Sequence, residues 1–135
     1  MSEINQAAHA QPAFAEFLGL KVTSVSPERV TAELKAREDL NNRHGIMHGG
    51  AIMALADNLG GTCATANLPP GHATTTIESK TNFFAPVPLG DVAFAECTPL
   101  HVGKSTIVLQ TKVTRGDGRL CALVTQTQMV LKPKA

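Results

Sequence analysis

Two hydrophobic periods divide this chain of 135 residues into one long helix and a set of strands. Residues 49–66 are small and mostly apolar, with Asp57 as their one charged side chain. A helix that is apolar on all sides is predicted to be buried. Elsewhere apolar and polar residues alternate, which is typical of strands with one buried face. This alternation predicts strands over residues 20–36, with a turn at 26–28, and over 74–84, 92–100, 105–113 and 120–131.

The order of these elements predicts the fold class. The last three strands are joined by short turns, one of them the Asp-Gly turn of residues 115–119, and are expected to form an antiparallel meander. One long buried helix followed by such strands indicates an α+β arrangement, in which an antiparallel sheet wraps around the helix. The length fits a single domain with one hydrophobic core.

The N-terminal region is predicted to contain a loose arm and a short helix. Residues 1–11 are polar and alanine-rich without periodicity, so we expect a flexible arm there and one domain over residues 12–135. Residues 12–18 begin with a proline and carry Phe14, Phe17 and Leu18 on one face. This pattern predicts an amphipathic helix that packs through these three side chains.

Composition excludes several classes of protein. The chain is 43% hydrophobic with a net charge of +1 and has no Trp or Tyr, so neither disorder nor nucleic-acid binding is indicated. Cys63, Cys97 and Cys121 are odd in number and lie inside predicted elements, which is typical of reduced core thiols in a cytoplasmic protein. The sequence shows neither a signal peptide nor a membrane-spanning run, so no membrane partner is expected.

The start of the long helix is the main candidate for chemistry. The first N–H groups of a helix have no internal partner, and the Gly49-Gly50 pair lets a ligand approach them closely. Such donors stabilise an oxyanion, although a glycine pair also serves where a helix packs against a sheet. Asp57 follows Gly49 by eight residues, about 12 Å along the axis, so one small carbonyl cannot contact both in one chain. We therefore predict a dimer with composite sites.

Other candidate residues carry weaker signals. Asn42 lies in the loop before the helix, where an amide could orient a carbonyl or a water, but loop asparagines usually form turns. His44 and His48 have an i, i+4 spacing without a partner cluster, so no metal site is predicted. The Gly-Lys-Ser turn with Lys104 and Ser105 could contact ligand phosphates, although a turn lysine is more often solvated.

Residues 42–64 (NRHGIMHGGAIMALADNLGGTCA) resemble the signature of the hotdog-fold acyl-CoA thioesterases of the PaaI type. That pattern has an Asn or Gln in a loop, then HGG, and an acid eight residues after the first glycine. The matching residues are Asn42, His48, Gly49, Gly50 and Asp57. The stretches NFFAPVPLGD and GKS also resemble the third strand and the fourth turn of the family, so the similarity covers roughly residues 14–131.

The resemblance implies a hotdog-fold homodimer, often a dimer of dimers, that hydrolyses the thioester of an acyl-CoA without a cofactor. Asp57 would be the nucleophile or general base, while the Gly49 amide of the facing subunit polarises the carbonyl. Asn42 would orient the carbonyl or a water, and His48 is counted with these catalytic residues. Substrate or CoA contacts are expected from Gly50, Gly61, Thr62, Asn82, Phe83, Lys104 and Ser105. Some members carry a Ser or Thr four residues after the acid, where this chain has Gly61 with Thr62 beside it.

Two other functions stay open at the level of the sequence. The same fold hosts hydratases and dehydratases that act on thioesters, and His48 could converge with an acid on the reacting carbon. A non-catalytic acyl-CoA binding module would keep the same pocket without the chemistry. Phe83 and Phe84 suggest an aryl or medium-length acyl group.

Overall fold

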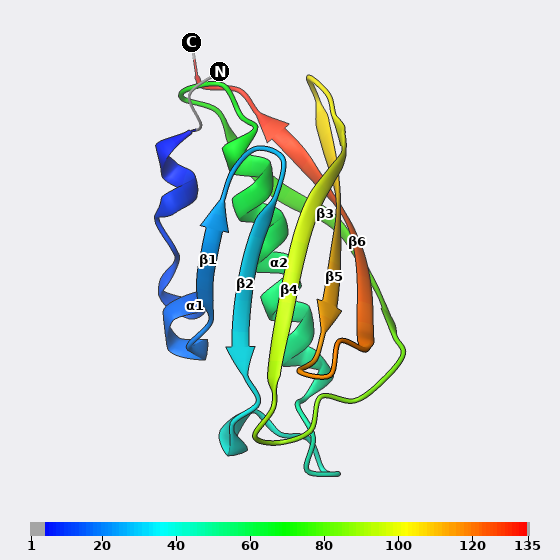
Figure 1. The fold of residues 1–135 in the computed structure, drawn as a ribbon. Coiled ribbons are helices and arrows are strands. Elements are labelled where there is room, and N and C mark those ends of the chain that lie inside the picture. The colour runs from blue at the N-terminus through cyan, green and yellow to red at the C-terminus, as the bar shows by residue number, and fades with distance from the viewer. Residues whose placement is uncertain (1–4, 135) are drawn as a thin grey trace.

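A six-stranded antiparallel sheet wraps around one long helix in the computed structural model, which describes residues 5–134 (Figure 1). This confirms the α+β architecture expected from the sequence. The strand order is β1-β2-β4-β5-β6-β3. The elements in chain order are η1 (Gln6–His9), α1 (Ala13–Leu18), β1 (Lys21–Val25), β2 (Val30–Lys35), η2 (Glu38–Leu40), α2 (Gly49–Ala66), β3 (Ala73–Phe83), β4 (Val92–Val102), β5 (Thr106–Thr114) and β6 (Leu120–Leu131).

The long helix α2 has the bounds that the sequence predicts, but only one side of it is buried. Leu55, Leu59 and Cys63 face the sheet and are fully buried. Each leucine buried in this way contributes about 1.5–3 kcal/mol. On the opposite side Met53 is 43% exposed and Asp57 is also exposed. The prediction of a helix buried all round was therefore wrong, because the sheet covers α2 on one side only.

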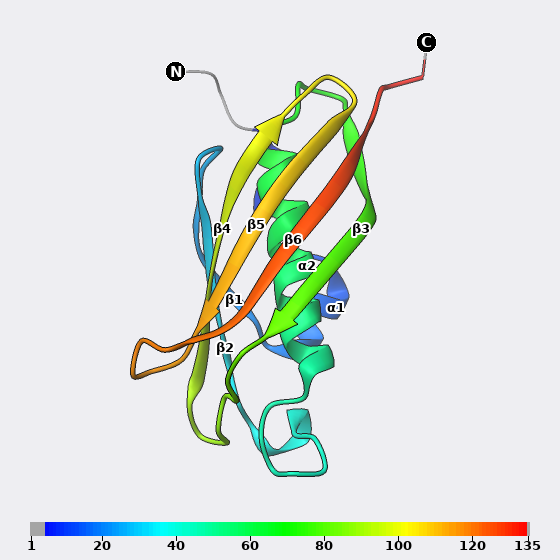
Figure 2. The same ribbon diagram turned by 90° about the vertical axis from the view of Figure 1, so that its right-hand side faces the viewer.

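The sheet pairing combines local and long-range contacts. Strands β4, β5 and β6 form the predicted antiparallel meander. Strand β3 pairs with β6 rather than with β4, its neighbour in sequence, and so becomes an edge strand (Figure 2). A bulge at Ile77 interrupts the pairing of β3 with β6. Nearly every residue of β3 is exposed, although the strand is eleven residues long.

Helix α1 packs through Leu18, as predicted, but not through Phe14 and Phe17. It begins after Pro12 and stops at Gly19, whose φ of 79° is the left-handed conformation that ends helices. Ala15 and Leu18 are its buried residues, whereas Phe14 and Phe17 are 62% and 79% exposed. The prediction that the phenylalanines pack inward was wrong. A helix of six residues presents only one row of side chains to its neighbour, and in α1 that row consists of Ala15 and Leu18.

Part of the predicted N-terminal arm contacts the domain. Residues 1–4 lie outside the described residues, and residues 6–9 form η1, which lies against α2. Ala8 is 1% exposed there. The division into a flexible arm and a domain from residue 12 stays a prediction.

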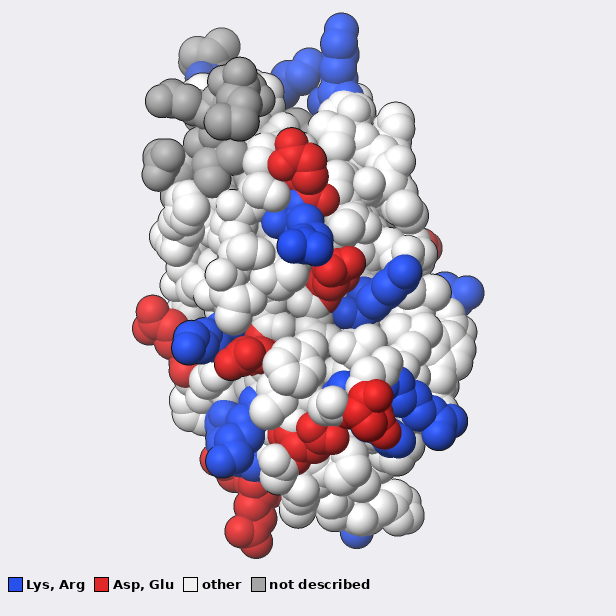
Figure 3. Space-filling model, viewed as in Figure 1, with Lys and Arg blue, Asp and Glu red and all other residues white. Residues whose placement is uncertain are grey.

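The surface and core agree with the composition. On the face seen in Figure 3, acidic and basic side chains lie side by side. Arg29 and Glu96 form an exposed ion pair at 3.3 Å. Cys63, Cys97 and Cys121 are buried free thiols in the described chain. In residues 5–134, none of the helices combines the length and the apolar character that crossing a membrane requires.

Candidate active site

Six of the predicted site residues line two clefts where α2 meets β3. The first, here called the acid cleft, has a volume of about 370 Å³ and contains Asp57, Gly61 and Thr62. The second, here called the glycine cleft, has a volume of about 440 Å³ and contains Asn42, Gly49 and Phe83. Helix α2 and strand β3 run in opposite directions, since Asp57 contacts Thr76 while Phe83 lies against Gly49. The acid and the glycine are thus separated along one groove, as the helical rise requires.

Asp57 presents one carboxylate oxygen to the protein and one to the acid cleft. Its Oδ1 atom accepts a hydrogen bond from the Thr76 hydroxyl at 3.1 Å and another, very short one from the Gln126 side-chain amide. Among residues 5–134, no hydrogen bond reaches Oδ2. The carboxylate therefore has a free oxygen at the surface of the chain.

Two buried glutamines on β6 belong to this site, and the sequence analysis missed them. Gln126 and Gln128 are 2% and 1% exposed. Both donate to the Thr76 hydroxyl, at 3.1 and 2.7 Å, and Gln128 also accepts from Thr74 at 3.0 Å. The alternation of residues along β6 could have revealed them. Both glutamines lie on the same strand face as Ala122 and Val124, where apolar residues are expected.

The two glycines at the start of α2 have different surroundings. His48 caps the helix, because its Nδ1 accepts a hydrogen bond from the Gly50 N–H at 2.8 Å. A Cβ at position 50 would lie 3.0 Å from this atom. The Gly49 N–H makes no hydrogen bond within the described part of the chain, and the glycine cleft opens at this residue. Gly49 is therefore the available donor at the positive end of the helix.

Asn42 forms a turn and also contributes to the glycine cleft. Its Oδ1 accepts hydrogen bonds from the backbone N–H groups of His44 and Ile46, at 2.8 and 3.3 Å. These contacts order the loop that leads to α2, as a turn asparagine does. Its side-chain NH2 group has no hydrogen bond to the described residues, so it is available in the cleft.

Several predicted residues are not placed at the carboxylate or the free amide. His48 lines a separate hollow beside Gly50. The Thr62 hydroxyl donates to the Asn58 carbonyl at 2.8 Å, within α2. Asn82 is exposed and, by strand alternation, points away from α2 on the side opposite to Phe83.

A third cleft of about 490 Å³, here called the lysine cleft, lies at the C-terminal end of α2. Lys104 lines it together with His72 and Lys132. Ser105 occupies the same turn, where its carbonyl accepts a hydrogen bond from the Val130 N–H at 2.9 Å. Lys104 and Ser105 thus lie apart from both Asp57 and Gly49.

The cysteines and the metal-binding side chains suggest no alternative centre. A hydrogen bond with Cys97 and burial both raise the pKa of the Cys63 thiol, and burial raises the pKa of Cys121. A raised pKa disfavours the thiolate that a nucleophile needs. The hydrogen bond with Cys63 lowers the pKa of the Cys97 thiol, but Cys97 is 0% exposed, so a substrate has no access to it. Within residues 5–134, no three His, Cys, Asp or Glu side chains gather as metal ligands would.

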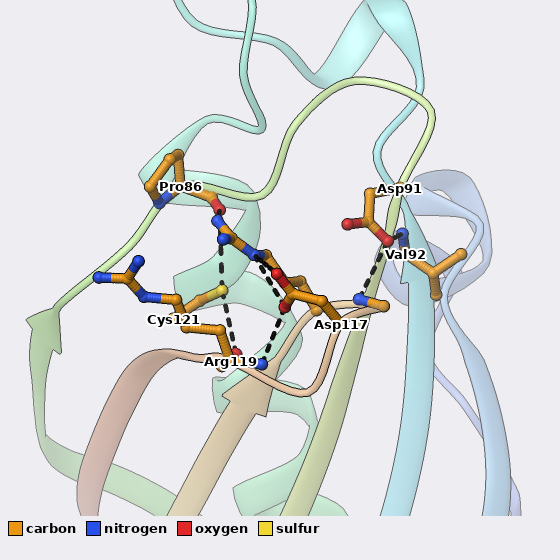
Figure 4. Close-up of polar contacts among 8 residues, drawn as sticks. Pro86, Asp91, Val92, Asp117, Arg119 and Cys121 are labelled. Carbon is orange, nitrogen blue, oxygen red and sulfur yellow. Dashed lines mark hydrogen bonds and ion pairs between the residues drawn. The ribbon is translucent and has the colours of Figure 1, made fainter.

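A hairpin beyond the site supports the wall of the glycine cleft. Arg115 donates to the Pro86 carbonyl at 2.8 Å and pairs with Asp117 at 3.1 Å. Asp91 accepts from Gly116 at 3.1 Å, which links the hairpin to β4 (Figure 4). Since Pro86 lines the glycine cleft, these contacts fix that wall to the β5–β6 turn.

Comparison with known proteins shows the family of this chain. Residues 44–122 match the family described as the thioesterase superfamily. A putative esterase of Saccharolobus solfataricus is 32% identical over 120 residues, which cover 88% of this chain and 84% of the relative. The 1,4-dihydroxy-2-naphthoyl-CoA hydrolase of Listeria monocytogenes is 27% identical, with 88% of this chain and 96% of the relative covered.

A solved structure confirms the fold. PaaI of E. coli, a protein of the phenylacetic acid degradation operon, matches with a TM-score of 0.84 over 95% of this chain and 91% of the PaaI chain. At 22% identity this likeness concerns the fold alone. It confirms the hotdog architecture that the sequence resemblance implies.

Proposed function

The chain belongs to the thioesterase superfamily and is a thioester hydrolase, and from this premise we propose that it cleaves acyl-CoA at a site shared by two copies of the chain. The observation that carries the proposal is the pair of half-sites along the groove between α2 and β3. Asp57 has a free carboxylate oxygen in the acid cleft, while Gly49 has a free N–H in the glycine cleft. Each half-site therefore provides either the carboxylate or the amide donor, but not both.

The chemistry of the proposed site follows from these two groups. The thioester carbonyl accepts a hydrogen bond from the Gly49 N–H at the positive end of α2, which stabilises the negative charge that develops on the oxygen. Asp57 of the other copy uses Oδ2 either to take a proton from water, which then adds to the carbonyl carbon, or to add to that carbon itself. Breaking of the C–S bond releases the CoA thiolate, which takes up a proton, and leaves the free acid in the first route and a mixed anhydride with Asp57 in the second, which water then hydrolyses. Because Asn42 lines the same cleft as Gly49, its NH2 group is proposed to hold the carbonyl or the water. The products of both routes are a free acid and CoA.

The exposed edge of β3 suggests how the copies meet. A long unpaired edge strand is a template for pairing with another chain, and a symmetric dimer would pair β3 with itself in antiparallel fashion. On β3, Thr76 lies beside Asp57 and Phe83 lies beside Gly49. If Thr76 pairs with Phe83 of the partner strand, the two-fold axis of the dimer passes between Ser79 and Lys80. Asp57 of each copy then faces Gly49 of the other.

The clefts also suggest where the two ends of the substrate bind. Ile52, Phe83, Phe84 and Val87 make the glycine cleft largely apolar, as suits an aryl or medium-length acyl group. The lysine cleft, with Lys104, Lys132 and His72, is suited to the phosphates of CoA. Support for a CoA thioester also comes from the Listeria relative, which is named a CoA hydrolase.

His48 favours hydrolysis over hydration. A hydratase would need His48 and an acid at one carbon, but His48 is engaged as the helix cap and lines a hollow other than the glycine cleft, which Asp57 of the other copy is proposed to face. Release of CoA, and not addition of water to crotonyl-CoA, is therefore the expected reaction.

The test measures CoA release with a thiol reagent on a panel of aryl, medium-chain and long-chain acyl-CoA substrates. We expect Asp57→Asn to lower kcat about 10²- to 10⁴-fold, because it removes the base or nucleophile while keeping the size of the side chain. Glu96→Gln, which removes a carboxylate from the outer face of the sheet, serves as the control and should keep full activity. An active Asp57→Asn enzyme would exclude the proposed chemistry, and binding of acyl-CoA without turnover by the wild type would indicate a binding module.

A further inference from the structure

We propose that Gln126 is a positioning residue, whose side-chain amide holds the Asp57 carboxylate so that Oδ2 faces the substrate. This inference rests on the proposed function of Asp57. Gln126 is 2% exposed on β6, between β5 and β3, and its Nε2 atom donates to Oδ1 of Asp57. An exposed carboxylate has several rotamers, so a fixed donor beneath it selects one of them.

The Thr76 hydroxyl accepts hydrogen bonds from the two glutamines and donates its own proton to Asp57. The Thr76 oxygen accepts from Gln126 at 3.1 Å and from Gln128 at 2.7 Å, which uses both of its lone pairs. Its one proton is then free to go to Oδ1 of Asp57 at 3.1 Å. Oδ1 thus receives two donors, from Gln126 and Thr76. Because these donors occupy Oδ1, Oδ2 is the oxygen left to react.

Helix α2 has a glycine where the Gln126 side chain packs against it, and the buried Gln126 amide carries an unpaired oxygen that destabilises the fold. A Cβ at Gly60 would lie 1.5 Å from the Gln126 Oε1 atom and 2.5 Å from its Cδ atom, so only glycine fits at this position of α2. Oε1 is buried without a hydrogen-bond partner among the described residues. Burying an unpaired amide oxygen destabilises a protein, and an apolar side chain of the same length would avoid that penalty. The hydrogen bond to Asp57 is the contact that an apolar residue cannot replace.

Gln110 provides a control outside the site. It lies half-buried on the outer face of β5 and lines neither the acid cleft, the glycine cleft nor the lysine cleft. Methionine has nearly the length of glutamine and no donor. We expect Gln126→Met to lower kcat about 10- to 100-fold with KM within about 2-fold of the wild type, because the carboxylate loses its orientation. Gln110→Met should keep kcat within about 2-fold of the wild type.

A double mutant separates positioning from a general loss of structure. If Gln126 acts through Asp57, Gln126→Met should cause no further loss of CoA release in an Asp57→Asn background. Thermal unfolding should show Gln126→Met to be as stable as the wild type. If this variant fails to fold, Thr76→Val removes the second donor to Oδ1 at an exposed position, and kcat should fall about 3- to 10-fold at constant KM.

The outcomes distinguish this inference from the proposed function. An active Asp57→Asn enzyme overturns both. An inactive Asp57→Asn enzyme with unchanged kcat in Gln126→Met, or in Thr76→Val where the first does not fold, overturns the role of Gln126 alone. Equal losses in the Gln126 and Gln110 variants, or an additive loss in the double mutant, would also overturn it, since both outcomes indicate a structural effect.

Discussion

At the scale of single residues, neighbouring glycines at the start of α2 have separate roles. Gly50 leaves space for the His48 ring, and its N–H is already used by that cap. Gly49 keeps a free N–H and lets the Phe83 ring approach, since a Cβ there would lie 3.2 Å from the Phe83 Cζ atom. The close contacts at both glycines therefore agree with the packing interpretation, and the free N–H of Gly49 supports the proposed oxyanion role.

The Gly49 amide can be removed without breaking the helix. Proline is tolerated at the first helical position, and the ψ of 136° at His48 is compatible with a following proline. We expect Gly49→Pro to lower kcat about 10²- to 10³-fold, because the oxyanion loses its donor. Gly49→Ala is the matched control: it adds a similar contact with Phe83 but keeps the N–H. Equal kcat values in the two variants would exclude the amide as the oxyanion donor.

At the scale of elements, the site depends on segments that are distant in sequence but adjacent in the sheet. Strand β3 brings Thr76 to Asp57, and β6 supplies the buried glutamines beneath them. The β5–β6 hairpin contributes from further away. Its Arg115 holds the Pro86 carbonyl, and Asp117 holds Arg115 in turn.

The hairpin should add a pH-dependent contribution to stability. The hydrogen bond from Arg115 holds the pKa of Asp117 below its ordinary value of about 3.9. A lowered pKa stabilises the folded state above the ordinary value, and this stabilisation is lost as the pH falls through the lowered one. We expect urea unfolding to show the wild type slightly more stable than Asp117→Asn at pH 6, with the difference vanishing toward pH 2. The effect is small because the pair is exposed. A difference that grows in acid would contradict this account.

At the scale of the whole molecule, the proposed site is divided between two clefts of one chain. The acid cleft and the glycine cleft lie at different points of the same groove, and the exposed edge of β3 runs between them. A symmetric pairing of that edge would complete both sites at once. The oligomer is therefore part of the proposed chemistry and not only a source of stability.

Mixed oligomers test this arrangement. Asp57→Asn and Gly49→Pro are each expected to be nearly inactive, but a dimer that contains one of each has one intact site. Refolding the two variants together in equal amounts should restore about a quarter of the wild-type activity, since half of the dimers are mixed and one of their two sites works. Size-exclusion chromatography checks that dimers form. Mixed dimers without recovered activity would show that each site belongs to one chain.

The sequence by itself determined the local structure and the type of chemistry. Its hydrophobic periods placed α2 at residues 49–66 and indicated the strands, because side-chain spacing follows the backbone repeat. The rise of a helix was enough to separate Gly49 from Asp57. The motif was enough to indicate the family, since its residues lie close together along the chain.

The tertiary structure decided the contacts between distant segments and the burial of each face. The pairing of β3 with β6 set Gln126 and Thr76 around Asp57, and nothing local in the chain encodes that neighbourhood. It also left Asp57 and the phenylalanines of α1 exposed, where apolar patterning alone predicted burial. The physical reason is that periodicity tells which residues share a face, whereas the packing of the whole chain decides which faces are covered.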